Sequence, residues 1–482
     1  MVKKYLTSSS LSRTNPLIFE CIDSDEQRLN ATRFVRGDLP RDPQAMAARL
    51  AKQFIEQNRG ILNNFDVQAS QDYDGQNIWL VLKTGIKAGA FPLLSPTSGK
   101  PEYGMVIKPR FEWAGIGSML AQMGWRITPT LLKLPLIPGT ERKVPPWVLS
   151  SIVLIRVRTL LDQLERRFEL IQTIQPAPKG TVDWSDYATR KIPNAKFLQI
   201  SCQYPDLRDD RTLRAAVHFT LRKQLAGLES QRNLTGAVLS LIDLCQSLIR
   251  RVAAVPPQRP SSEMLQTWLT GPMRIEAFRE GIHAVGWTVE DRGLAGLADL
   301  QGLPWVLPMD TFFEAWVETL VTRLARDTGG VLRTGRKRET LTPIHWDNPF
   351  IGTQKYLLPD VILERDDVTF IFDAKYKRHW EEFNSTNWGQ IEKEIQEQHR
   401  QDLLQVLAYS SLKSSQRVVA CLIYPCQNQT WESLKRRGRL FQHASLPANG
   451  RNIEIVLTAV PMTSDVGAAV ENIKLAVGTL PM

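Results

Sequence analysis

The chain has 482 residues, of which 43% are hydrophobic and 23% are charged, a composition typical of a globular protein that folds in water. This length exceeds one ordinary hydrophobic core, so two or three domains are expected. The net charge of +10 is compatible with a polyanionic partner, although many enzymes of this size match it.

Membrane and secretory signals are absent from the sequence, which predicts a cytoplasmic protein. The longest apolar stretch, around Ile152, is short and is interrupted by Arg156, so no segment is expected to span a membrane. The first residues lack the continuous apolar stretch of a secretory signal. Five cysteines without a CxxC pair argue against a disulfide framework and against a structural zinc site.

Residues 1–146 are expected to form a β-rich region. Segments 77–84 and 104–109 have the composition of strands and are bounded by glycine and proline. A short helix is predicted at 113–125. The proline-marked stretch 128–146 is expected to form a loop or extended arm. An ordinary surface loop is the favoured interpretation, and contact with a partner protein is the alternative.

Residues 147–300 are expected to form a mainly helical domain. Apolar residues recur at helical spacing from Val148 to Thr173, and Phe168 lies on the apolar side of that predicted helix. After an irregular piece at 176–204, further helices are predicted at 209–228, 233–255 and 261–269. Asp209 or Asp210 is the expected N-cap of the first of these.

Residues 301–482 have the pattern of a mixed α/β domain, because helical and strand-like segments alternate. Asp310 is expected to cap a helix that ends at the Gly329, Gly330 pair. Two strands follow it, and after them come a polar helix at 388–412 and strands at 418–425 and 452–461.

Segment 357–380 places charges beside apolar strand residues. Val, Ile and Phe lie on both sides of an acidic turn at 364–367, which predicts two strands in a hairpin. Alternate residues of a strand share a face, so Asp373 and Lys375 project to the same side. Asp360, at the start of the first strand, approaches Asp373 in such a hairpin. Because a buried unpaired charge is costly, these charges either pair with one another or serve a site.

Two carboxylates and an ammonium group at one place suit a hard cation. Mg²⁺, for which Mn²⁺ can substitute, usually takes one or two carboxylates and completes its shell with water and substrate phosphate. Such an ion polarises a phosphoryl group and lowers the pKa of a bound water, which a neighbouring lysine can orient. The pattern therefore predicts a Mg²⁺ site at Asp360 and Asp373, with Lys375 as the catalytic lysine.

This arrangement resembles the PD-(D/E)XK nuclease motif, which is matched by Pro359, Asp360, Asp373, Ala374 and Lys375. The resemblance implies a third acidic metal ligand on the preceding helix, where Glu314 is favoured over Glu318. It also implies the QxxxY pair of the RecB-like branch, which is matched here by Gln405 and Tyr409. The structural alternatives are a glutamate paired with an arginine, and a core tyrosine hydrogen-bonded to an amide.

A basic segment precedes the two strands and is a candidate for contact with DNA phosphates, the alternative being a solvated surface. Its candidate residues are Arg333, Arg336, Lys337 and Arg338. The histidines lack the spacing of a zinc site. No GxxxxGK[ST] motif occurs, so the chain is not expected to hydrolyse nucleotides by itself.

The wider pattern resembles the McrC family, the nuclease subunit of McrBC-type modification-dependent restriction systems. The resemblance rests on "GMVIKPRF", "PKGTVDW", "ISCQYPDLRDDRTLRAAVHFTL", "MDTFFEAWV" and "LLQVLAY", and covers roughly residue 104 to the C-terminus. It implies Mg²⁺-dependent cleavage of DNA in antiviral defence, by a subunit that works with an McrB-like AAA+ GTPase ring. Two alternatives are a stand-alone nuclease in repair or transposition, and a nuclease-fold scaffold or activator subunit.

Overall fold

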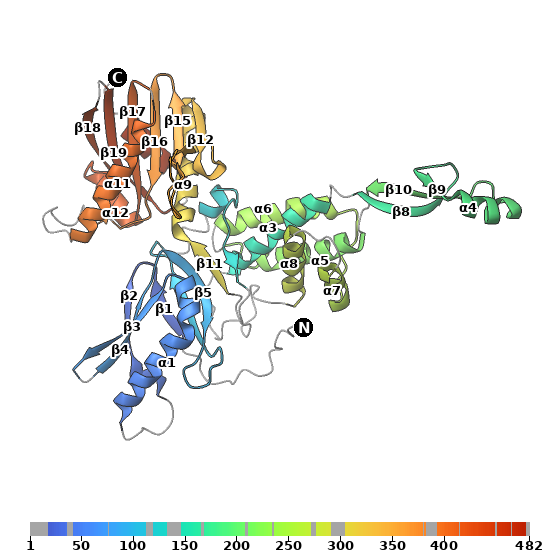
Figure 1. Cartoon of the computed structure of the whole chain (residues 1–482), viewed down its shortest axis with the longest axis horizontal. Helices are drawn as coiled ribbons and strands as arrows, with labels where there is room; N and C mark the ends of the chain where they lie inside the picture. Colours follow the sequence, from blue (N-terminus) through green and yellow to red (C-terminus); the bar gives the residue numbers. More distant parts are fainter. Residues whose placement is uncertain are drawn as a thin grey trace. The chain divides into compact units, whose positions relative to one another are not determined.

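The computed structural model divides the chain into two compact units (Figure 1). One unit comprises residues 1–145, 235–237 and 301–482, and the other comprises 146–234 and 238–300. Residues 1–145 and 301–482, which the sequence analysis treats as two domains, thus share one unit. The structure describes residues 18–35, 42–75, 77–111, 119–132, 146–164, 168–207, 211–233, 236–270, 276–290, 304–378, 380–381, 393–413, 415–448, 451–463 and 465–478.

A five-stranded sheet explains why the two ends of the chain share a unit. Its strand order is β1 (Ile18–Ile22), β6 (Tyr103–Lys108), β5 (Lys87–Leu93), β11 (Trp305–Pro308) and β7 (Thr130–Leu131). The strand β11 follows the helical unit in sequence, yet it pairs antiparallel with both β5 and β7. The buried Trp305 and Leu307 of β11 therefore belong to the N-terminal sheet.

A second sheet and one long helix complete the N-terminal part. The sheet has the order β2 (Glu26–Asn30), β4 (Asn77–Lys83) and β3 (Gln68–Asp74). The strands predicted at 77–84 and 104–109 are thus confirmed as β4 and β6. The 22-residue helix α1 (Pro43–Asn64) was not predicted from the sequence. Asp42 caps it by accepting hydrogen bonds from the backbone of Gln44 and Ala45. Of the helix predicted at 113–125, residues 119–122 are helical and 112–118 lie outside the described residues, as do 133–145 of the proline-marked stretch.

The second unit is built mainly of helices, as predicted. They are α3 (Pro146–Leu164), α5 (Arg211–Glu229), α6 (Gly236–Val252), α7 (Ser262–Thr270) and α8 (Glu276–Val289). The prediction of one helix from Val148 to Thr173 is wrong beyond Leu164, because β8 (Phe168–Gln175) follows. The β8 sequence FELIQTIQ fits the two-residue period of a strand as well as the period of a helix. Pairing with a neighbouring strand decides in favour of the strand. Asp209 and Asp210 lie outside the described residues.

A small sheet extends from these helices (Figure 1). The strand β8 pairs antiparallel with β10 (Ile200–Leu207), which also pairs with β9 (Thr181–Val182). Between β9 and β10 the chain forms the short helix α4 (Trp184–Asp186) and two further helical turns. The irregular piece predicted at 176–204 is therefore corrected to a sheet with helical turns at its end.

The C-terminal part is mixed α/β, as predicted. Its six-stranded sheet has the order β12 (Val331–Thr334), β15 (Val361–Arg365), β16 (Val368–Ala374), β17 (Arg417–Cys426), β19 (Arg451–Pro461) and β18 (Phe441–Ala448). The predicted hairpin is confirmed as the antiparallel pair β15 and β16, and β17 continues the sheet parallel to β16. Two further strands, β13 (Thr342–Pro343) and β14 (Tyr356–Leu357), form a separate two-stranded pair.

Helices contact the hairpin from two segments of the chain. α9 (Met309–Thr328) packs on β12, β15 and β16, and α11 (Lys393–Ser411) packs on β16 and β17. α12 (Asn428–Arg436) and α13 (Val466–Gly478) contact β19. The N-cap of α9 is Pro308 rather than Asp310, whose carboxylate accepts a hydrogen bond from the adjacent Thr311 backbone. No helix in the described ranges is long and apolar enough to cross a membrane.

Candidate functional site

The carboxyl end of β16 brings two aspartates together. The β15–β16 register pairs Val361 with Phe372, so Asp360 and Asp373 are the next residues at that end of the hairpin. Asp360 Oδ2 accepts a hydrogen bond of 2.8 Å from the backbone N–H of Ala374. The Asp373 side chain is 1% exposed. The hairpin therefore presents both predicted carboxylates at one end of β16.

Lys375 connects this end of the hairpin to α11. Its Nζ lies 2.7 Å from Asp373 Oδ2 in an ion pair and donates a hydrogen bond of 3.0 Å to Gln405 Oε1. Gln405 Nε2 in turn donates a hydrogen bond of 2.7 Å to the Tyr409 hydroxyl. A chain of contacts thus runs from Asp373 through Lys375 and Gln405 to Tyr409, linking four of the residues selected from sequence.

The two glutamates on α9 have different surroundings. Glu314 is half-buried, and its pKa is raised to about 6 by burial and by repulsion from Asp310, while Lys375 opposes the shift. Glu318 is buried and lies 3.3 Å from an Arg126 nitrogen and 3.6 Å from an Arg336 nitrogen. Glu318 is therefore held by two arginines, whereas Glu314 responds to the charges of the candidate site.

Burial and mutual repulsion shape the ionisation of the aspartates. Burial raises the pKa of Asp360 well above its ordinary value, and the charges of Asp373 and Glu314 raise it further. Burial also raises the pKa of Asp373, although Lys375 opposes that shift. For Lys375, burial lowers the pKa, but attraction to Asp373 and Asp360 outweighs it, so the net shift is upward. Such a group of buried acids favours a cation or protons nearby.

A second charged network lies beside this group and was missed in the sequence analysis. Lys377 Nζ lies 2.7 Å from Asp402 Oδ1, and the Tyr424 hydroxyl donates a hydrogen bond of 3.2 Å to Asp402 Oδ2. His399 Nδ1 lies 3.3 Å from the same hydroxyl. Asp402 precedes Gln405 by three residues on α11, so helical spacing was the signal that could have found it.

The basic segment packs directly against Asp360. Gly335 N donates a hydrogen bond of 2.8 Å to the backbone oxygen of Asp360, and the Thr340 hydroxyl donates one of 2.6 Å to the oxygen of Pro359. Two exposed residues, Lys337 and Arg338, make no side-chain ion pair with any described residue. The other two candidates are engaged, because Arg333 lies 3.2 Å from Glu364 and Arg336 lies 3.6 Å from Glu318.

The residues present fit a hard cation held in part by its substrate. Among the described residues, no three His, Cys, Asp or Glu side chains converge closely enough to hold a metal ion. Asp373, which is buried, and Asp360, which is half-buried, nevertheless provide two adjacent carboxylates with raised pKa values. Mg²⁺ commonly binds one or two carboxylates and completes its shell with water and phosphate oxygens.

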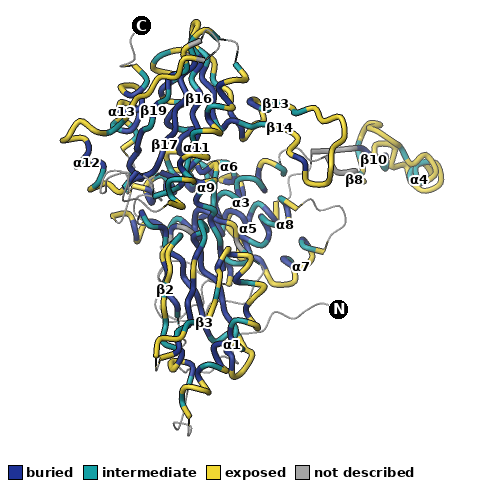
Figure 2. The backbone as a smooth tube through the Cα atoms, turned by 60° about the vertical axis from the view of Figure 1, so that its left-hand side comes forward, coloured by how far each residue is buried: buried dark blue, intermediate teal, exposed yellow. Residues whose placement is uncertain are grey.

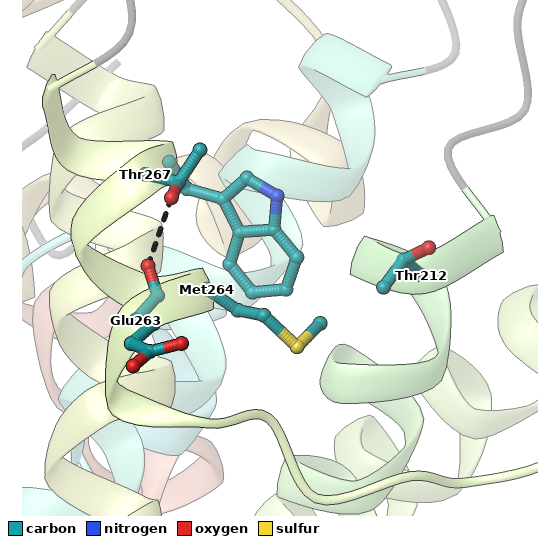
Figure 3. A pocket seen from close by; sticks show the side chains of 5 residues that line it. Thr212, Glu263, Met264 and Thr267 are labelled. Carbon is teal, nitrogen blue, oxygen red and sulfur yellow. Dashed lines mark hydrogen bonds between the residues drawn. The ribbon is translucent and has the colours of Figure 1, made fainter.

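A shallow pocket elsewhere lacks comparable chemistry. It lies in the helical unit, with a volume of about 360 Å³, and is lined by Thr212, Glu263, Met264, Thr267 and Trp268 (Figure 3). The Thr267 hydroxyl donates a hydrogen bond of 2.9 Å to the Glu263 backbone oxygen. One carboxylate and one indole ring form no cluster of titratable groups, so the hairpin remains the candidate site.

Comparisons with known proteins place this chain beside restriction-system components. A family model described as "McrBC 5-methylcytosine restriction system component" matches residues 147–425. No curated protein sequence matches the chain. One similar solved structure is a half-complex from an assembly of Thermococcus gammatolerans McrB AAA+ hexamers with bound McrC. It has 14% identity and a TM-score of 0.42, over 96% of this chain and 100% of that chain. A cryo-EM structure of the Thermococcus gammatolerans McrBC complex has 14% identity and a TM-score of 0.25, over 64% and 88% of the two chains.

Proposed function

Because the chain belongs to the McrBC family of 5-methylcytosine restriction system components, we propose that it is the DNA-cleaving subunit of such a system. Its C-terminal part is proposed to be a PD-(D/E)XK nuclease domain. The observation that carries the proposal is the contact of Lys375 with both Asp373 and Gln405 beside Asp360. The reaction proposed is Mg²⁺-dependent hydrolysis of phosphodiester bonds in DNA.

Each side chain of the site has a proposed role. Asp360 and Asp373 would hold the metal ion, and Glu314 would add an acidic group from α9. A bound Mg²⁺ supplies charge stabilisation at the phosphoryl oxygens and an activated water. Lys375 would orient the attacking water or stabilise the charge that develops on the phosphate. Gln405 and Tyr409 position Lys375 through the hydrogen bonds that connect them.

A nucleotide-hydrolysing partner is part of the proposal. The family is described as a system component, and the sequence of this chain has no GxxxxGK[ST] loop. In the Thermococcus gammatolerans assembly, McrC is bound to McrB AAA+ hexamers. On the basis of family membership, we propose that this chain likewise works with an McrB-like AAA+ GTPase ring.

Substitution of the site residues tests the cleavage activity. We expect Asp360→Asn, Asp373→Asn and Lys375→Ala each to reduce plasmid cleavage at least a hundredfold, measured with Mg²⁺, GTP and the partner ring. Asp367→Asn is the matched control, because Asp367 is an exposed aspartate in the turn of the same hairpin. Cleavage by Asp373→Asn at the parental rate would contradict the assignment of the catalytic site to the hairpin. Full cleavage by the parent without a partner would indicate a stand-alone nuclease.

Metal binding can be tested without measuring activity. A cation bound only by the folded protein raises the midpoint of thermal unfolding by mass action. We therefore expect Mg²⁺ or Mn²⁺ to raise the midpoint of the parent, and Asp373→Asn to lose this increase. Equal increases in the two proteins would place the bound metal at another site.

A further inference from the structure

The loop between β13 and β14 exposes an unusual amount of apolar surface. Trp346, Phe350 and Ile351 are 49%, 71% and 103% exposed, and Tyr356, the first residue of β14, is 39% exposed. Single exposed apolar residues are ordinary, but several large ones in one short loop indicate a contact surface. Figure 2 shows this segment as exposed where it leaves the β13–β14 pair. We call residues 345–356 the aromatic loop.

Internal hydrogen bonds give the aromatic loop a defined shape. Trp346 Nε1 donates a hydrogen bond of 2.7 Å to the backbone oxygen of Gln354, and the Thr353 hydroxyl donates one of 2.6 Å to the backbone oxygen of Phe350. A backbone hydrogen bond of 2.8 Å from Ile344 to Lys355 closes the base of the loop. The exposed side chains are therefore presented by a folded loop.

The aromatic loop lies close to the candidate site along the chain. Tyr356 precedes Asp360 by four residues, and four residues span at most about 14 Å. The basic segment at 333–338 is fixed to the same place by the hydrogen bond from Gly335 to the Asp360 oxygen. Between residues 333 and 356 the sequence has five Lys and Arg residues against two Asp and Glu residues. The base of the aromatic loop and the basic segment thus both lie near Asp360.

We propose that the aromatic loop contacts the bases of DNA bound at this site, inserting Phe350 or Ile351 between base pairs, while Lys337 and Arg338 contact phosphates. This inference rests on the proposed function. Apolar side chains that enter a base step unstack it and bend the duplex, and nearby cations neutralise the backbone. The positive charge around the loop favours DNA over a second copy of this chain, since two such surfaces would repel.

The salt dependence of DNA binding separates the two kinds of contact. We expect the double variant Phe350→Ser, Ile351→Ser to bind duplex DNA about tenfold or more weakly, with the same dependence on salt concentration as the parent. Lys337→Gln, Arg338→Gln should also weaken binding, but it should reduce the salt slope by about 2, since each phosphate contact contributes about 0.9. Fluorescence anisotropy with the full chain, without divalent ions, measures both.

A base analogue in the DNA tests insertion directly. Duplexes containing 2-aminopurine should become more fluorescent on binding the parent, because unstacking relieves quenching, and the Phe350→Ser, Ile351→Ser variant should lose this increase. The control variant Leu446→Ser, Leu475→Ser removes two exposed leucines elsewhere in the C-terminal part and should behave like the parent. Parental affinity and fluorescence in the loop variant would overturn the proposal.

The outcomes also separate this proposal from its alternatives. If the loop variant binds DNA normally but changes the sedimentation of the protein, the loop joins two copies of the chain and the base-contact proposal fails. Because binding is measured without metal, failure of cleavage by the parent with Mg²⁺ and its partner would reject the proposed function alone. If the loop variant no longer unstacks bases and the parent cleaves DNA normally, both proposals are supported.

Discussion

Arg110 lies over the ring of Tyr376, with its guanidinium carbon 4.7 Å from the ring centroid. Tyr376 directly follows Lys375, whereas Arg110 follows β6 of the N-terminal sheet. Asp23 fixes Arg110 by accepting hydrogen bonds from its backbone at 2.7 Å and from two guanidinium nitrogens at 3.1 Å each. The N-terminal sheet therefore contributes to the packing around the candidate catalytic lysine.

Arg110→Met tests how strongly this contact stabilises the protein. The Arg110 and Asp23 side chains are 5% and 0% exposed, so the substitution leaves a buried carboxylate without its partner. We expect the free energy of unfolding to fall by about 3–5 kcal/mol. Denaturant unfolding measures this fall, and the control is Arg28→Met, which breaks exposed ion pairs and should cost about 1 kcal/mol or less. Similar losses in the two variants would contradict the argument.

Removal of the N-terminal part should destabilise the protein more than Arg110→Met does. A fragment that begins at Gly302 keeps β11 but loses β5 and β7, the strands that pair with it. We expect the fragment to aggregate or to bind a hydrophobic dye, because Trp305 and Leu307 lose their cover. Co-expression with a separate chain of residues 1–145 should restore a folded complex. A monomeric fragment with the thermal midpoint of the full chain would show that the C-terminal part folds alone.

Features formed by residues close together in sequence were predictable, and features formed by distant residues were not. The β15–β16 hairpin was predictable, because a polar turn separates two apolar strands and Asp360, Asp373 and Lys375 lie within 16 positions of one another. Gln405 and Tyr409 were selected because they match the QxxxY pair of the RecB-like branch, and that spacing places them one helical turn apart. The contacts of Asp23 with Arg110 join residues 87 positions apart, and no local period indicates such a pair.

The prediction of secondary structure failed where pairing with a strand distant in sequence overrode the local pattern of apolar residues. The apolar residues of segment 168–175 fit both the period of a helix and the period of a strand. Pairing with β10 makes the segment a strand. The helix α1 was missed because many polar residues weaken its apolar pattern, although Asp42 and Pro43 are ordinary helix-start signals. The strand β11 could not be assigned to the N-terminal sheet, since its partners lie more than 170 residues away in sequence.

Gly335→Ala is expected to disturb the candidate site through the backbone. A Cβ atom at this position would lie 2.7 Å from the Pro359 oxygen and 3.3 Å from the Asp360 oxygen. Both neighbours are backbone atoms, so the hairpin end must move, and we expect plasmid cleavage to fall tenfold or more. The control is Gly60→Ala in α1, where a Cβ meets nothing within 4 Å. That variant should retain cleavage and gain about 0.5–1 kcal/mol of stability from its higher helix propensity. Parental cleavage by Gly335→Ala would show that the close approach tolerates a methyl group.

The raised pKa of Glu314 predicts a pH dependence of stability. Burial and repulsion from Asp310 raise this pKa from 4.5 to about 6. Between these values the folded protein retains a proton that the unfolded chain has released. Because the native state binds more protons there, the contribution of Glu314 to the free energy of unfolding falls as pH rises through this window and is constant above it.

Glu314→Gln should remove this contribution, together with the repulsion that the charge of Glu314 exerts on Asp360. The variant should therefore gain stability relative to the parent as pH rises from about 4.5 to about 6. Denaturant unfolding at a series of pH values, with EDTA to exclude divalent ions, measures the difference directly. A difference that does not change with pH would show that Glu314 ionises alike in the folded and unfolded chains. If the difference changes as expected, adding Mg²⁺ should reduce it, because a cation beside Asp360 and Asp373 favours the charged form of Glu314.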